Sequence, residues 1–60
     1  MIAISEQIEC VEREISQRKR VYARLVSTGK MTQHKADRET ATMQAVLATL
    51  RELENKGRLI

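Results

Sequence analysis

The chain has 60 residues, with 11 Lys and Arg against 8 Asp and Glu, a net charge of +3, no Pro, Trp or Phe, two Gly and one Cys. A chain this short has room for one domain with a small core, and a single cysteine excludes an internal disulfide. Its richness in Ala, Leu, Glu, Lys, Arg and Gln is typical of long helices. We therefore expect one all-α domain over residues 1–60.

The sequence carries no pattern that indicates a membrane or an export route. No apolar run approaches the ~20 residues that cross a bilayer, and the N-terminus lacks a basic region followed by an apolar core. A lone cysteine is typical of a reducing compartment. We expect a cytoplasmic protein with no membrane contact.

The first predicted helix spans residues 4–27. Its seam repeats at alternating spacings of four and three, as in a heptad pattern, and consists of Ile4, Ile8, Val11, Ile15, Arg18, Tyr22 and Leu25. Cys10 and Val21 lie together on one flank, so the apolar arc is wider than one partner helix covers. Acids crowd the first half of this helix and bases the second, which suits the helix dipole.

A break at residues 27–32 predicts the turn between two helices. Gly29 can adopt the left-handed conformation that ends many helices. The Thr32 hydroxyl can cap the next helix while Met31 packs on Ala36. Because the connection is short, we expect the two helices to be antiparallel neighbours.

The second predicted helix spans residues 32–55. Its seam consists of Ala36, Thr40, Met43, Leu47 and Leu50, with Val46 and Leu53 on the flank. Asn55 and Gly57 predict its end, followed by a short tail of Arg58, Leu59 and Ile60. A hairpin that pivots near Lys30 makes residues face each other when their numbers add to about 61.

Both helices offer more apolar surface than a hairpin hides, so we expect two or more hairpins to pack together. The commonest closed solution is a homodimeric four-helix bundle. The expected interface residues are Cys10, Val21, Met43, Val46, Leu50 and Leu53. The alternative is a monomer whose long Arg, Lys and Glu side chains lie over the flank residues.

The sequence lacks the signatures of an enzyme, a cofactor site or a metal site. It has no nucleophile elbow, no glycine-rich phosphate loop and no paired metal motif. We interpret His34 as a surface histidine, because Asp37 is the only acid within a helical turn of it. We interpret Cys10 as a small buried residue, since its neighbours are acids rather than the cations that activate a thiol.

Positive charge is concentrated in residues 18–35, which carry no acid. The six bases there are Arg18, Lys19, Arg20, Arg24, Lys30 and Lys35. In a hairpin they surround the turn, next to the free amides of the second helix, where an anion such as a nucleic acid or nucleotide can bind. The simpler interpretation is a solvated surface that suits the helix dipole. Arg18 holds a seam position. We expect it to pair with Glu14, to pair with Glu39 across the hairpin, or to set the register of the bundle.

The stretch RVYARLVSTGKMT at residues 20–32, followed by KADRE at 35–39 and MQAVL at 43–47, resembles a group of short uncharacterised proteins from bacteriophages and prophages. The similarity covers residues 15–53. It implies a phage accessory protein that binds a host or phage macromolecule stoichiometrically. Two further functions stay open: a nucleic-acid or nucleotide binder, including one that sequesters a nucleotide in counter-defence, and a structural or assembly component.

Overall fold

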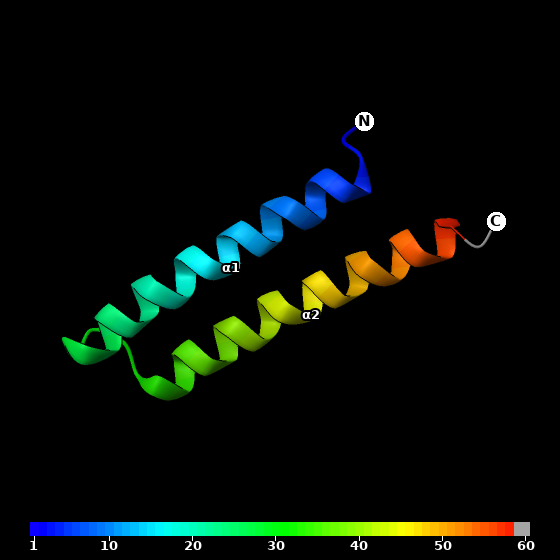
Figure 1. Ribbon diagram of the computed structural model, residues 1–60. Coiled ribbons are helices and arrows are strands. Elements are labelled where there is room, and N and C mark those ends of the chain that lie inside the picture. The colour runs from blue at the N-terminus through cyan, green and yellow to red at the C-terminus, as the bar shows by residue number, and fades with distance from the viewer. Residues whose placement is uncertain (59–60) are drawn as a thin grey trace.

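The computed structural model describes residues 1–58 and consists of two helices, α1 (Ile4–Ser27) and α2 (Gln33–Arg58). Figure 1 shows them running antiparallel and side by side. The turn lies at one end of the resulting rod, the turn end, and the start of α1 lies beside the end of α2 at the other, the open end. The Cα atoms extend over 48 × 17 × 14 Å. The predicted all-α helical hairpin is confirmed.

The end of α1 is a glycine-based Schellman turn. Gly29 has a φ of 75°, a conformation that a side chain would strain. The Gly29 amide donates to the Val26 carbonyl at 3.1 Å, and the Lys30 amide donates to the Leu25 carbonyl at 2.8 Å. These bonds satisfy carbonyls that the end of a helix leaves without partners. The predicted stop at Gly29 is confirmed.

Thr32 caps α2. The Lys35 amide donates to Thr32 Oγ1 at 3.1 Å, and the Ala36 amide donates to the Thr32 carbonyl at 3.1 Å. Met31 is half-buried and Ala36 is buried, in line with an apolar contact across the cap. The stop and start signals therefore act within six residues, which makes the hairpin tight.

The helix α2 continues to Arg58, three residues beyond the end that we predicted at Asn55. Gly57 does not adopt the positive φ that ends a helix; among the glycines of residues 1–58, Gly29 alone has one. A glycine within a helix costs conformational entropy but breaks no hydrogen bond, so Gly57 weakens the last turn without stopping it. The predicted tail residues Leu59 and Ile60 lie outside the described residues.

The core is a single thin stripe along the seam. Ile8 and Ile15 of α1 are 8% exposed and Ala36 of α2 is 5% exposed. The remaining apolar seam residues are half-buried, namely Ile4, Val11, Tyr22 and Leu25 on α1 and Met43, Leu47 and Leu50 on α2. Two helices alone shield only one stripe of each other, so most of the seam stays in partial contact with water.

An ion pair between the helices reports the register of the hairpin. Arg51 Nη2 donates to Glu12 Oε2 at 2.8 Å. Side chains on a helix lean toward its N-terminus by about one residue, so the contact lies near the level of residue 11 on α1 and residue 50 on α2. This level agrees with the predicted register, in which facing positions add to about 61.

Candidate functional site

Exposed apolar side chains gather on one side of the hairpin. Val21 is 47% exposed, Val46 44% and Leu53 49%, and Cys10 is exposed as well. Cys10, Val46 and Leu50 line one open groove between the helices. The flank of α1 that carries Cys10 and the flank of α2 that carries Val46 therefore belong to the same side.

Helical periodicity brings the remaining predicted interface residues to this side. Val21 follows Cys10 by about three turns, Leu53 follows Val46 by about two, and Met43 precedes Val46 by about one. We call this side the apolar face and define it by Cys10, Val21, Met43, Val46, Leu50 and Leu53. Met43 and Leu50 are half-buried because they also belong to the seam.

The groove in the apolar face has a volume of about 550 Å³. Its apolar lining consists of Ile2, Cys10, Val11, Val46 and Leu50, and its polar lining of Glu6, Gln7 and Arg13. A small-molecule site is usually enclosed and buries most of its ligand, whereas this groove is open along the rod.

Cys10 corrects one of the sequence-based interpretations. We expected a small buried residue, yet its side chain is exposed in the single chain. The reason is its position on the flank of α1, two residues after the buried Ile8 and therefore about 200° around the helix from it. The hairpin alone does not cover this flank, so burial of Cys10 requires a second molecule.

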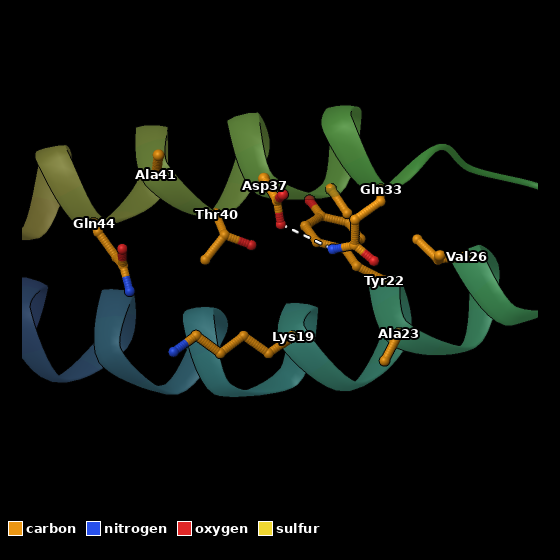
Figure 2. Close-up of a pocket in the computed structure, with 10 residues that line it drawn as sticks. Lys19, Tyr22, Ala23, Val26, Gln33, Asp37, Thr40, Ala41 and Gln44 are labelled. Carbon is orange, nitrogen blue, oxygen red and sulfur yellow. Dashed lines mark hydrogen bonds between the residues drawn. The ribbon is translucent and has the colours of Figure 1, made fainter.

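A second groove, of about 430 Å³, lies near the turn end on the other side of the hairpin (Figure 2). It contains Ala23, which stands about 200° around α1 from Val21 and so away from the apolar face. We call it the polar groove because Lys19, Tyr22, Gln33, Asp37, Thr40 and Gln44 line it. Figure 2 shows the Tyr22 side chain reaching from α1 toward α2. Tyr22, a predicted seam residue, is half-buried.

Asp37 lines the polar groove, and His34 lies nearly one turn before it on α2. Asp37 Oδ1 accepts a hydrogen bond from Gln33 Nε2 at 2.9 Å, so its carboxylate is engaged by a neighbour on its own helix. His34 is exposed on the same turn. Within residues 1–58 no three His, Cys, Asp or Glu side chains come together as metal ligands.

Arg18 pairs with Glu14, one turn earlier on α1, rather than with Glu39 across the hairpin. The hydrogen bond from Arg18 to the Glu14 carboxylate, together with the charge of that carboxylate, raises the pKa of Arg18. Both side chains are about two-fifths exposed. Of the partners that the sequence left open, the structure selects the local one.

The other predicted anion-binding residues share one end of the rod but not one surface. Lys19, Arg20, Arg24, Lys30 and Lys35 are all exposed. Successive helical residues differ by about 100° in direction, so Arg18, Lys19 and Arg20 point to three different sides. The first turn of α2 contains no acid that would repel an anion.

The ion pair of Glu12 with Arg51 is a contact that the sequence reasoning missed. Opposite charges at positions whose numbers add to nearly 61 were a signal that could have revealed it.

No helix within residues 1–58 has the length and apolar character needed to span a membrane. Scans of protein-family models, of curated proteins and of solved structures found no match to this chain.

Proposed function

We propose that this protein is a non-catalytic helical interaction module that self-associates through its apolar face and binds another macromolecule stoichiometrically. Its resemblance to short phage proteins suggests a host or phage macromolecule as that partner. The observation that supports the proposal is the exposure of Val21, Val46 and Leu53 on the same side as Cys10.

The thin core supports self-association on energetic grounds. Ordering each residue costs about 1–2 kcal/mol of backbone entropy, while among residues 1–57 only Ile8, Ile15 and Ala36 are buried. Full burial of a Val or Leu side chain contributes about 1.5–3 kcal/mol. Covering the half-exposed Val21, Val46 and Leu53 therefore adds roughly 1 kcal/mol for each residue in each copy.

The dimensions of the hairpin also fit a dimer. A side of 48 × 17 Å has an area of roughly 800 Å², which is the area that each partner contributes to a standard stable interface. A twofold dimer buries both apolar faces at once and leaves neither of them exposed for the addition of further copies. The expected product is a four-helix bundle.

Sedimentation equilibrium at micromolar concentration tests self-association. We expect twice the 6.9 kDa chain mass for the native protein. Val46→Glu should give a monomer because it places a charge in the buried interface. Ala45→Glu is the matched control, since it adds the same charge one residue away on an exposed position that points about 100° away from Val46. A folded native chain of monomer mass would reject this part of the proposal.

Stoichiometric binding is tested by capture on the immobilised native protein from host lysate, followed by titration of the purified captured molecule. Saturation at a fixed molar ratio, with the captured molecule recovered chemically unchanged, supports an interaction module. Conversion of that molecule to a product would contradict the non-catalytic proposal.

A second candidate function is binding of nucleic acid or a nucleotide at the turn end. Its support is that residues 18–35 carry no acid and that five of their six bases are exposed. Fluorescence anisotropy with a labelled oligonucleotide should give an affinity that falls steeply with salt. Lys30→Glu with Lys35→Glu should abolish it, while Lys56→Glu at the open end should not. No binding at low ionic strength removes this candidate.

A further inference from the structure

We infer that two copies pack apolar face to apolar face in an antiparallel arrangement, with the turn end of one hairpin over the open end of the other. In this arrangement α1 packs on α1 of the second copy and α2 packs on α2. The inference rests on the self-association proposed above. It requires a twofold axis that crosses the rod near the middle of both helices.

The row of residues that α1 contributes to the apolar face is symmetric about its own midpoint. Positions 3, 7, 10, 14, 17, 21, 24 and 28 follow alternating spacings of four and three, as a packing row does. Reversal about the midpoint, between residues 14 and 17, exchanges Cys10 with Val21 and Gln7 with Arg24. Cys10 and Val21, the two residues that α1 contributes to the apolar face, therefore meet each other across the axis.

The row on α2 has its midpoint at Val46. Reversal about this residue leaves Val46 facing its own copy, and it exchanges Leu50 with Thr42 and Leu53 with Glu39. The aliphatic stem of Glu39 can cover Leu53 while its carboxylate stays in water. The exposed Val46 side chains thus form the centre of the interface.

The register of the hairpin places these two midpoints at the same level. The pair of Glu12 with Arg51 corresponds to facing positions that add to about 61. The level between residues 15 and 16 of α1 therefore lies opposite residues 45–46 of α2. A single twofold axis can serve both helices only because the midpoints coincide.

Charge favours the same arrangement. Residues 1–17 carry four acids and one base, whereas residues 18–35 carry six bases and no acid. Antiparallel packing brings Glu6, which borders the apolar groove, to the level of Arg24 of the second copy. Arg13, the basic residue that lines that groove, reaches the level of Arg18 of the second copy, whose charge is already offset by Glu14. With both turns at one end, the two basic ends would instead repel each other.

That other twofold arrangement makes different residues neighbours. Its axis runs along the rod, so α1 packs on α2 of the second copy. Cys10 then lies near Leu50 and Leu53, and Val46 lies near the level of residue 15. The two Val46 side chains are diagonal across the bundle and do not meet. Disulfide crosslinking therefore distinguishes the two arrangements.

The experiment uses the full chain under mild oxidation, with products measured by mass under non-reducing conditions. One variant carries Val46→Cys together with Cys10→Ser, the second adds Val21→Cys to the native Cys10, and the third adds Leu53→Cys to the native Cys10. All four positions are exposed in the single chain, so the hairpin should form, and circular dichroism checks that it does.

We expect the first two variants to form covalent dimers roughly tenfold faster than the native chain, because a disulfide requires Cα atoms within about 7 Å. In the antiparallel dimer the two native Cys10 residues lie about 16 Å apart along the rod, so the native chain crosslinks slowly. The Leu53→Cys variant should form covalent dimers no faster than the native chain does.

Two results would overturn the inference in distinguishable ways. Fast crosslinking of the Leu53→Cys variant without crosslinking through residue 46 would reject the antiparallel arrangement and leave self-association standing. Sedimentation of the unoxidised native chain as a monomer would reject self-association itself, and the arrangement with it.

Discussion

Arg51 and Glu12 form an ion pair across the hairpin at 2.8 Å, with their side chains 55% and 46% exposed. Exposed pairs of this kind contribute about 0.2–1 kcal/mol. A double-mutant cycle of Glu12→Gln and Arg51→Gln, followed by urea unfolding, should give a coupling energy in that range. The coupling should fall toward zero at about 1 M salt, where the Debye length is about 3 Å. A coupling that is independent of salt would argue against an electrostatic origin.

The two glycines should respond to alanine in opposite directions. Gly29→Ala should destabilise the hairpin by about 1–2 kcal/mol, because a Cβ strains the left-handed conformation at φ 75°. Gly57→Ala should be neutral or stabilising by up to about 1 kcal/mol, since α2 runs through this residue and a Cβ there meets nothing within 4 Å. Thermal unfolding measures both changes, and a loss of stability in Gly57→Ala would contradict the helical end of α2.

The Thr32 cap should be worth about 1 kcal/mol, because its Oγ1 accepts the otherwise unsatisfied Lys35 amide. Thr32→Ala should lose this amount in urea unfolding and Thr32→Ser should retain most of it. Thr42→Ala is the matched control, since Thr42 Oγ1 donates to the Arg38 carbonyl within the helix and alanine is the better helix former. Equal losses in Thr32→Ala and Thr42→Ala would mean that the cap has no special role.

Arg18→Leu should raise the melting temperature, because an apolar residue replaces a charged one at a half-buried seam position. The pair with Glu14 that is lost is local and about two-fifths exposed, so its contribution is small. The raised pKa of Arg18 means that its stabilisation is present below the unfolded-state pKa, and it is therefore constant through neutral pH. A lower melting temperature would show that the pair outweighs the seam. A change in the sedimenting mass would instead assign Arg18 to the register of the bundle.

The turn was predictable because its determinants are local. Gly29 and Thr32 act on amides and carbonyls within four residues of themselves, so sequence spacing alone reveals them. The end of α2 was not predictable, because a glycine permits both a helical and a left-handed conformation. Gly57 adopts the helical one. The partner of Arg18 was left open because two carboxylates were candidates, that of Glu14 one turn away and that of Glu39 across the hairpin, and the sequence alone did not decide between them.

Six residues were predicted as an oligomer interface, and three of them, Cys10, Val46 and Leu50, line one groove of the hairpin. Cys10 was expected both on a flank that the hairpin leaves uncovered and as a small buried residue, because the sequence does not separate burial within one chain from burial between chains. The polar groove could not be foreseen either. Its lining includes Ala23, Ala36 and Ala41, whose small side chains leave space that larger side chains would fill.

The start of α1 and the end of α2 both lie at the open end, and this placement has a mechanical consequence. A pulling force applied to residues 4 and 58 loads the hairpin as a zipper, so the seam contacts peel apart one level at a time and the Gly29 turn bears tension last. A force applied between the turn and either end loads the seam in shear, and many contacts must then give way together. The same rod should therefore resist the second kind of force far longer than the first.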